Sequence, residues 1–153
     1  MRRRTFDALM VAAGLALTAI LLVAGGLLTW GHNFVSSEVR SQLVAQKIVF
    51  PPASSDAITS LAKADAAAMR VYGGQEMTTG AQAQTYADHF IAVHLREIGG
   101  GLTYSQLSAK AMADPKNTAL AGQVATIFKG TTLRGMLAEI GRASCRERVL
   151  RLV

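Results

Sequence analysis

An uninterrupted apolar run near the N-terminus constrains this chain more than any other feature of its sequence. The run extends from Ala8 to Gly31, contains no charged residue and includes the chain's single tryptophan, Trp30. As a helix with a rise of about 1.5 Å per residue, it reaches about 36 Å, enough to cross a hydrocarbon core of about 30 Å with some tilt. The run therefore predicts a transmembrane helix over residues 8–31.

Charged residues on the two sides of this run predict its orientation. Three arginines, residues 2–4, precede it, whereas the segment from His32 to Val39 carries only Glu38 as a formal charge. Because positively charged flanks stay on the cytoplasmic side, we expect residues 1–7 to form a cytoplasmic tip and the main domain to lie outside the plasma membrane. The alternative is a cleaved secretory signal, although the apolar region of a signal is typically only about 7–15 residues long.

Small residues inside the run predict where another helix would contact it. Gly14 and Thr18 stand four residues apart, as do Ala12 and Ala16, and this spacing places each pair on one face of a helix. Small side chains let two helix backbones approach closely in a bilayer. Another membrane helix is therefore one expected partner, beside the lipid bilayer itself. The alternative is that these residues reflect only the usual composition of membrane helices.

The distribution of charge argues against a nucleic-acid partner. The chain has 153 residues, is 50% hydrophobic and carries a net charge of +6. Residues 1–7 contribute +2 and residues 140–153 contribute +3, which leaves only +1 for residues 31–139. Since a nucleic-acid-binding domain concentrates positive charge on its own surface, we expect no nucleic acid among the partners. The size and composition fit one small domain plus membrane segments.

The last fourteen residues, IGRASCRERVLRLV, differ in character from the rest of the chain. The run Ile140–Val149 is the translation of ATC GGA AGA GCG TCG TGT AGG GAA AGA GTG, a common short-read sequencing adapter. We therefore expect residues 140–153 to be an adapter artefact fused to a reading frame truncated near Ala138; the alternative is a natural basic tail. The single cysteine, Cys145, lies in this segment, so the remaining sequence offers neither a disulfide nor a thiolate metal site.

The segment 32–130 predicts a small extracytoplasmic domain built from helices. Apolar spacing continues the first helix to about Lys47, and the Pro51-Pro52 pair then excludes helix. Apolar spacing and flanking Ser, Thr, Gly and Pro residues predict further helices over about 54–72, 79–98, 104–112 and 118–128. Gly130 is expected to end the last of these, and residues 131–139 to begin a second membrane span. The sequence thus predicts an all-α fold: a transmembrane helix, a small outer helical domain and the truncated start of a second transmembrane helix.

Two histidines, His89 and His94, lie in the most strongly patterned of these helices. Their spacing of five puts them about 140° apart on a helix, unlike the four-residue spacing of a helical zinc pair. A carboxylate is also available nearby, from Asp88 or Glu97, so an iron site of two histidines and one carboxylate stays possible from the sequence. The alternative places His89 at the surface and His94 in the core. The sequence contains no phosphate-binding loop, nucleophile elbow or dinucleotide fingerprint. We therefore assign no catalytic, cofactor-binding or metal-binding residue and expect no cofactor.

Three segments resemble a family of small actinobacterial membrane proteins of unknown function. They are FDALMVAAGLALTAILLVAGGLLTW, YGGQEMTTGAQAQTYADHFIAVHLREIGGGLTYSQLS and GTTLRGML. The resemblance implies two spans flanking an extracytoplasmic helical domain, with both termini inside. Members often carry the label of an aromatic ring-opening dioxygenase small subunit, but a membrane anchor and scattered histidines match a soluble iron enzyme poorly. We therefore expect a non-enzymatic cell-envelope protein whose outer domain binds a protein or lipid partner, with the dioxygenase subunit as the alternative.

Overall fold

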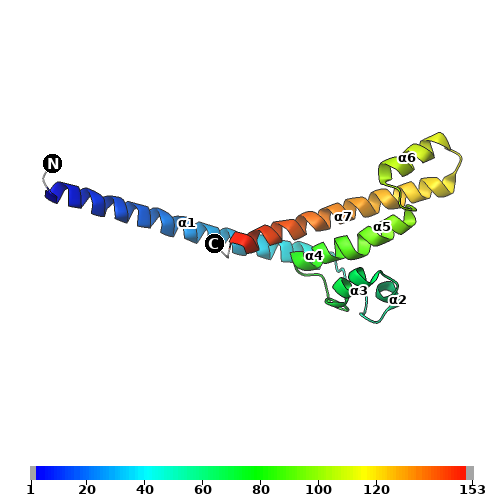
Figure 1. The fold of residues 1–153 in the computed structure, drawn as a ribbon, viewed down its shortest axis with the longest axis horizontal. Helices are drawn as coiled ribbons and strands as arrows, with labels where there is room; N and C mark the ends of the chain where they lie inside the picture. Colours follow the sequence, from blue (N-terminus) through cyan, green and yellow to red (C-terminus); the bar gives the residue numbers. More distant parts are fainter. Residues whose placement is uncertain (1–2, 151–153) are drawn as a thin grey trace. The chain divides into compact units, whose positions relative to one another are not determined.

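The computed structural model describes residues 3–150, including the side chains of residues 3–143, and is helical through most of this length (Figure 1). An isolated antiparallel bridge between Val49 and Glu76 is the one extended pairing in these residues. The all-α prediction is confirmed. Arg2, residues 151–153 and the side chain of Cys145 lie outside the described residues. The chain divides into two compact units, Met1–Glu38 and Val39–Val153, which are taken separately below as unit 1 and unit 2.

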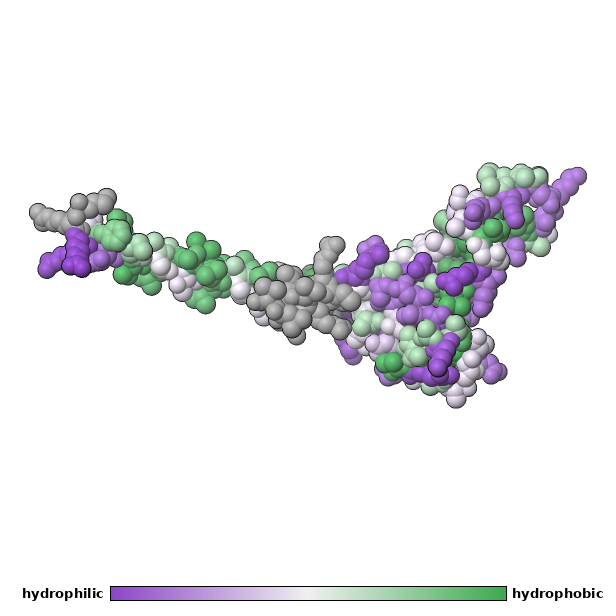
Figure 2. Space-filling model, viewed as in Figure 1, coloured by the Kyte–Doolittle hydropathy of each residue, from purple (hydrophilic) through white to green (hydrophobic). Residues whose placement is uncertain are grey.

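Unit 1 consists of the first part of a single helix, α1 (Arg3–Ala45). It is the one helix in the described residues that is long and apolar enough to cross a membrane. Figure 2 shows hydrophobic side chains along this helix, with hydrophilic ones at its N-terminal end. The prediction of a long apolar helix near the N-terminus that can span a membrane is therefore confirmed. The predicted continuation of the same helix beyond Gly31 is also confirmed, since α1 ends only at Ala45.

The rest of unit 2 consists of further helices, most of which pack against the last one. In chain order they are α2 (Asp56–Thr59), α3 (Lys63–Arg70), α4 (Gly80–Tyr86), the π-helical turn η1 (Ala87–Ile91), α5 (Ala92–Ile98), α6 (Tyr104–Ala113) and α7 (Thr118–Leu150). α4, η1 and α5 follow one another without a break and lie along α7, and α6 packs on the N-terminal part of α7 (Figure 1). Unit 2 is therefore a helical domain whose longest element contacts most of the others.

Local capping explains where several of these helices begin and end. The hydroxyl of Thr79 accepts the Gln82 N–H, and the Gln82 side chain accepts the Thr79 N–H, so α4 begins with a complete capping box. Thr103 begins α6 in the same way. At the end of α5, Gly100 and Gly101 adopt φ values of 57° and 79°, which favour glycine. These ends lie where the sequence predicts them because the signals are local.

The predicted single helix over residues 54–72 is wrong. The structure has two short helices, α2 and α3, separated by residues 60–62. The Ser60 hydroxyl donates to the Asp56 carbonyl at 2.6 Å, and the Leu61 N–H turns back to the Ile58 carbonyl. This tight turn ends α2 and lets both Ile58 and Leu61 reach the core. The burial of these two side chains therefore explains the break between α2 and α3, which the spacing of apolar residues in the sequence does not show.

The predicted helix end at Gly130 is also wrong, because α7 runs through it from Thr118 to Leu150. A Cβ atom at Gly130 would lie 2.4 Å from Cδ2 of Leu95, so this glycine gives α5 room to approach α7. The segment predicted to begin a second membrane span, residues 131–139, lies inside α7, and its Leu137 and Ala138 are buried in the core of unit 2. Gly141, in the adapter-like segment, is buried as well.

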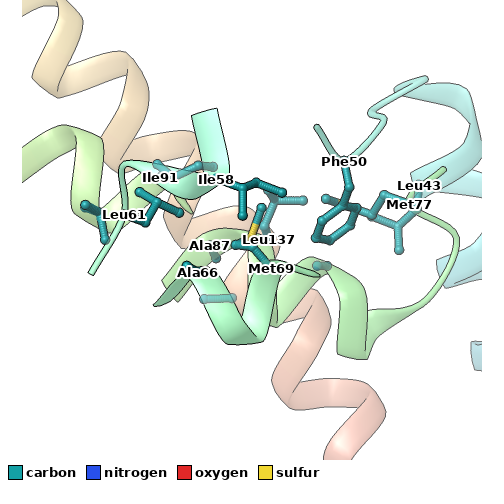
Figure 3. Packing of buried hydrophobic residues seen from close by; sticks show 13 residues of the cluster. Leu43, Phe50, Ile58, Leu61, Ala66, Met69, Met77, Ala87, Ile91 and Leu137 are labelled. Atoms are coloured by element: carbon teal, nitrogen blue, oxygen red, sulfur yellow. The ribbon is translucent and has the colours of Figure 1, made fainter. Parts of the chain in front are cut away.

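The core of unit 2 joins α1, α2, α3, η1 and α7 through apolar side chains (Figure 3). Leu43 comes from the end of α1 and Leu137 from α7, and both are almost fully buried. Phe50 contacts the rings of Tyr72 and Tyr86, with centroids 5.4 and 5.2 Å apart. The remaining fully buried members are Ile58, Ala66, Met69, Met77, Ala83 and Ala87. Burial of these side chains removes apolar surface from water and so stabilises the domain.

Candidate functional site

The most distinctive surface of the molecule is a set of exposed apolar side chains on α1, which we call the apolar sleeve. Consecutive residues such as Ile20, Leu21 and Leu22 are all exposed, so the sleeve surrounds the helix rather than following one face. A helix that is hydrophobic all round is buried in a large core or in a membrane. Its members are Phe6, Leu9, Met10, Val11, Leu15, Leu17, Ile20, Leu21, Leu22, Val23, Leu27, Leu28, Trp30 and Phe34.

Hydroxyl groups inside the sleeve are satisfied within the helix. Thr18 donates from Oγ1 to the Gly14 carbonyl at 2.9 Å, and Thr29 donates to the Gly25 carbonyl at the same distance. A hydroxyl without a partner is costly in hydrocarbon, where no water is present to bind it. Both threonines are therefore compatible with lipid on the outside of the helix.

The C-terminal end of the sleeve carries an aromatic pair. The rings of Trp30 and Phe34 stack with centroids 5.7 Å apart and an interplanar angle of 18°. One turn of helix separates them, so they share a face of α1. The predicted span, residues 8–31, includes Trp30 but ends before Phe34.

The small residues of the sleeve leave open space beside the helix. A Cβ atom added at Gly14, Gly25 or Gly26 would meet no atom within 4 Å. The second membrane helix expected near Gly14 and Thr18 stays a prediction.

A second candidate site is the group of polar side chains around η1, which we call the η1 cluster. Arg134 of α7 donates from Nη2 to Asp88 Oδ1 at 3.1 Å and from Nε to the Ala87 carbonyl at 3.3 Å. Gln84 donates from Nε2 to the other oxygen of Asp88. On the opposite side, Nδ1 of His89 lies 2.7 Å from Asp65 Oδ1 of α3. The cluster thus links η1 to α7 and to α3.

The structure does not bring the two predicted histidines to one site. His89 pairs with Asp65, and its side chain is 39% exposed, whereas Nδ1 of His94 lies 2.8 Å from the Phe90 carbonyl of its own helix. The His94 ring also packs on Phe90, with centroids 4.4 Å apart. Among the described residues, no three His, Cys, Asp or Glu side chains are grouped closely enough to hold a metal ion.

The two carboxylates considered for an iron site, those of Asp88 and Glu97, do not lie with both histidines. Asp88 binds Arg134 and Gln84 and so contributes to helix packing. Glu97 is exposed near the end of α5. Asp65 and Arg134, the two partners that the sequence analysis missed, stand 24 and 46 residues from their partners in η1, too far for any helical spacing to reveal.

A partly buried tyrosine lies next to the η1 cluster. Tyr86 contacts Phe50 on one side and Phe90 on the other, with the second pair of centroids 4.9 Å apart. Burial raises the pKa of Tyr86 above its ordinary value of 10.0 because the apolar surroundings disfavour the phenolate. At neutral pH Tyr86 is therefore a neutral packing residue.

No family model matches the chain, and neither does any curated protein or solved structure. What the chain does is therefore inferred from its own residues. The η1 cluster joins helices through partly exposed ion pairs, while the apolar sleeve presents a surface that water does not favour. Of the two candidate sites, the sleeve has the clearer chemical requirement, which is an apolar environment around the helix.

Proposed function

We propose that this chain is an integral protein of the plasma membrane and cell envelope, anchored by α1 and without enzymatic activity of its own. Its N-terminus lies in the cytoplasm and unit 2 lies outside, where it binds a protein or lipid partner. The observation that carries this proposal is that the most apolar stretch of α1 is wholly unburied along a length sufficient to cross a bilayer. The resemblance to small actinobacterial membrane proteins implies the same topology, with a helical domain outside the cytoplasm.

The charges at the ends of the sleeve support the orientation. Arg3 and Arg4 lie in the first turn of α1, and Asp7 is the one acidic residue between them and Glu38. Placing arginines outside the cytoplasm opposes the usual bias of membrane insertion. Unit 2, which follows the outer end of the sleeve, is then extracytoplasmic.

The organisation of unit 2 supports binding rather than catalysis. The charged side chains of the η1 cluster pair with one another across helices, which is the arrangement of groups that hold a fold together. In contrast, apolar side chains are left exposed on unit 2, among them Val71, Met112 and Phe128. A partner that covers these side chains would remove apolar surface from water.

Membrane extraction and reporter fusion test the proposal in cells. The full chain is expected to remain with membranes after an alkaline carbonate wash and to be released by detergent. A phosphatase reporter fused after Gly130 is expected to be active, because this enzyme needs the oxidising exterior. The same reporter fused after Asp7 serves as the matched control and is expected to be inactive.

Three outcomes would contradict parts of this proposal. An inactive reporter after Gly130 would reverse the orientation. A mature N-terminus near Leu27 would show that α1 is a cleaved secretory signal. Stoichiometric iron in the purified protein, lost on His89→Ala substitution, would favour a dioxygenase subunit.

A further inference from the structure

The change from apolar to polar surface on α1 occurs at the Trp30–Phe34 pair. Before it, Leu27 and Leu28 are exposed and apolar. The first polar residues, His32 and Asn33, lie between the two rings. After Phe34 and Val35 the helix continues with Ser36, Ser37 and Glu38. The pair therefore stands where a helix leaving a bilayer would pass from hydrocarbon to water.

The two rings cover each other while staying exposed on their outer sides. Trp30 is 66% exposed and Phe34 is 56% exposed, although their centroids are only 5.7 Å apart. Stacked rings that are not inserted into the protein present one continuous aromatic surface. Tryptophan prefers the headgroup level of a bilayer, where its ring is partly in hydrocarbon and its N–H is wet.

The length of the sleeve makes the position of this pair matter. From Phe6 to Trp30 the helix rises about 36 Å, which exceeds the hydrocarbon thickness of about 30 Å. A span that is too long tilts, and interfacial aromatic and basic residues then decide its depth. Arg3 and Arg4 provide the inner anchor, so an outer anchor on one face of α1 would complete the placement.

We propose that the Trp30–Phe34 pair is a lipid-binding surface whose partner is the headgroup and carbonyl layer of the outer leaflet. The pair fixes where α1 leaves the bilayer, and it moves the membrane boundary from Gly31, as the sequence predicts, to Phe34 one turn later. The inference rests on the proposed function, because it needs α1 to span the membrane.

The single tryptophan makes the test direct, because all tryptophan emission comes from Trp30. The full chain is reconstituted in phosphatidylcholine vesicles whose acyl chains carry bromine at defined depths. Bromines nearest the headgroups are expected to quench Trp30 most strongly, and those near the bilayer centre least. Phe34→Ala is expected to shift or broaden this depth profile, whereas Phe34→Tyr, which keeps the ring, is expected to preserve it.

Leu28→Ala is the matched control, since it removes an exposed apolar side chain from the same end of α1 without removing a ring. Its quenching profile is expected to equal that of the natural sequence. Strongest quenching from the bilayer centre would overturn the inference, and so would equal profiles for Phe34→Ala and Leu28→Ala. Loss of the natural chain from the vesicles in a carbonate wash would instead overturn the proposed function, so the two failures are distinguishable.

Discussion

Leu22 and Leu43 belong to the same helix, yet Leu22 is 72% exposed and Leu43 only 1%. Around Leu22 the sequence is apolar on all sides, whereas near Leu43 the less exposed positions, such as Val39, fall on one face. A sequence that is apolar on all sides has no polar side to face water, so it favours the interior of a membrane or of a large protein core. One-sided apolar sequence packs on a protein core instead. The helix α1 thus contains two segments that favour different surroundings.

Charge in the middle of the sleeve should give the largest effect. Leu17→Arg together with Leu21→Arg places two arginines one turn apart where each costs about 2.5–3.5 kcal/mol in a membrane helix. The double variant is expected to lose its carbonate-resistant membrane fraction. Val71→Arg, at an exposed apolar position of unit 2, is expected to leave that fraction unchanged. Full membrane retention of the double variant would remove the distinction between the two regions.

Truncation of a buried ring should give the next largest effect. Phe50→Ala removes the side chain that packs on Tyr72 and Tyr86, and such a change costs about 3–5 kcal/mol in a core. The free energy of unfolding of unit 2, measured by denaturant titration in detergent, is expected to fall by that amount. Leu22→Ala, in the sleeve, is expected to leave it unchanged. Similar losses from both would show that the sleeve is part of the same folded core.

Two glycines of α7 have different surroundings: Gly130 packs closely against another helix, and Gly135 faces open space. Gly130→Ala would force a Cβ atom against Leu95, and overpacking of this kind costs about 1–3 kcal/mol. Gly135→Ala meets no atom within 4 Å and should stabilise unit 2 by about 0.5–1 kcal/mol, because alanine favours helix. Unfolding midpoints of the two variants are therefore expected to move in opposite directions. Equal shifts would mean that α5 does not approach α7 at Gly130.

The smallest expected effect comes from Tyr86 at alkaline pH. Its pKa is raised by burial, so the unfolded chain loses the Tyr86 proton at lower pH than the folded domain does. The contribution of the neutral side chain is complete below the unfolded pKa of 10.0 and is lost as the pH rises through the folded pKa. Tyr86→Phe is expected to reduce the fall in unfolding midpoint above about pH 10. If Tyr104→Phe reduces the alkaline fall in unfolding midpoint equally, the effect is not specific to Tyr86.

Helix ends set by neighbouring residues were predictable from the sequence, whereas contacts between distant helices were not. The capping box at Thr79 and the glycine end of α5 depend on residues within one turn. Gly130 carries the ordinary signal of a helix end, and only its contact with Leu95 of another helix shows its actual role. The break at Leu61 likewise depends on the core that this side chain reaches.

The π-turn had no distinct signal in the sequence. Ala83, Ala87 and Ile91 are all buried and stand four residues apart. In an α-helix each such step rotates the side chain by about 40°, so the three positions would still share one apolar face. The pairing of Asp88 with Arg134 had no local signal either, and the candidate iron site therefore included a carboxylate whose partner lies on another helix.

In η1, the Ala92 N–H bonds to the carbonyl of Ala87, five residues back instead of four. The turn therefore contains one residue more than an α-helical turn needs. Deleting a single residue between Ala87 and Ile91 would close the turn as ordinary α-helix and leave α4 and α5 facing α7. A deletion elsewhere from Gly80 to Ile98 would rotate all later side chains by about 100° and take Leu95 away from Gly130. The chain between Thr79 and Gly99 thus has one place where its length can change by a residue.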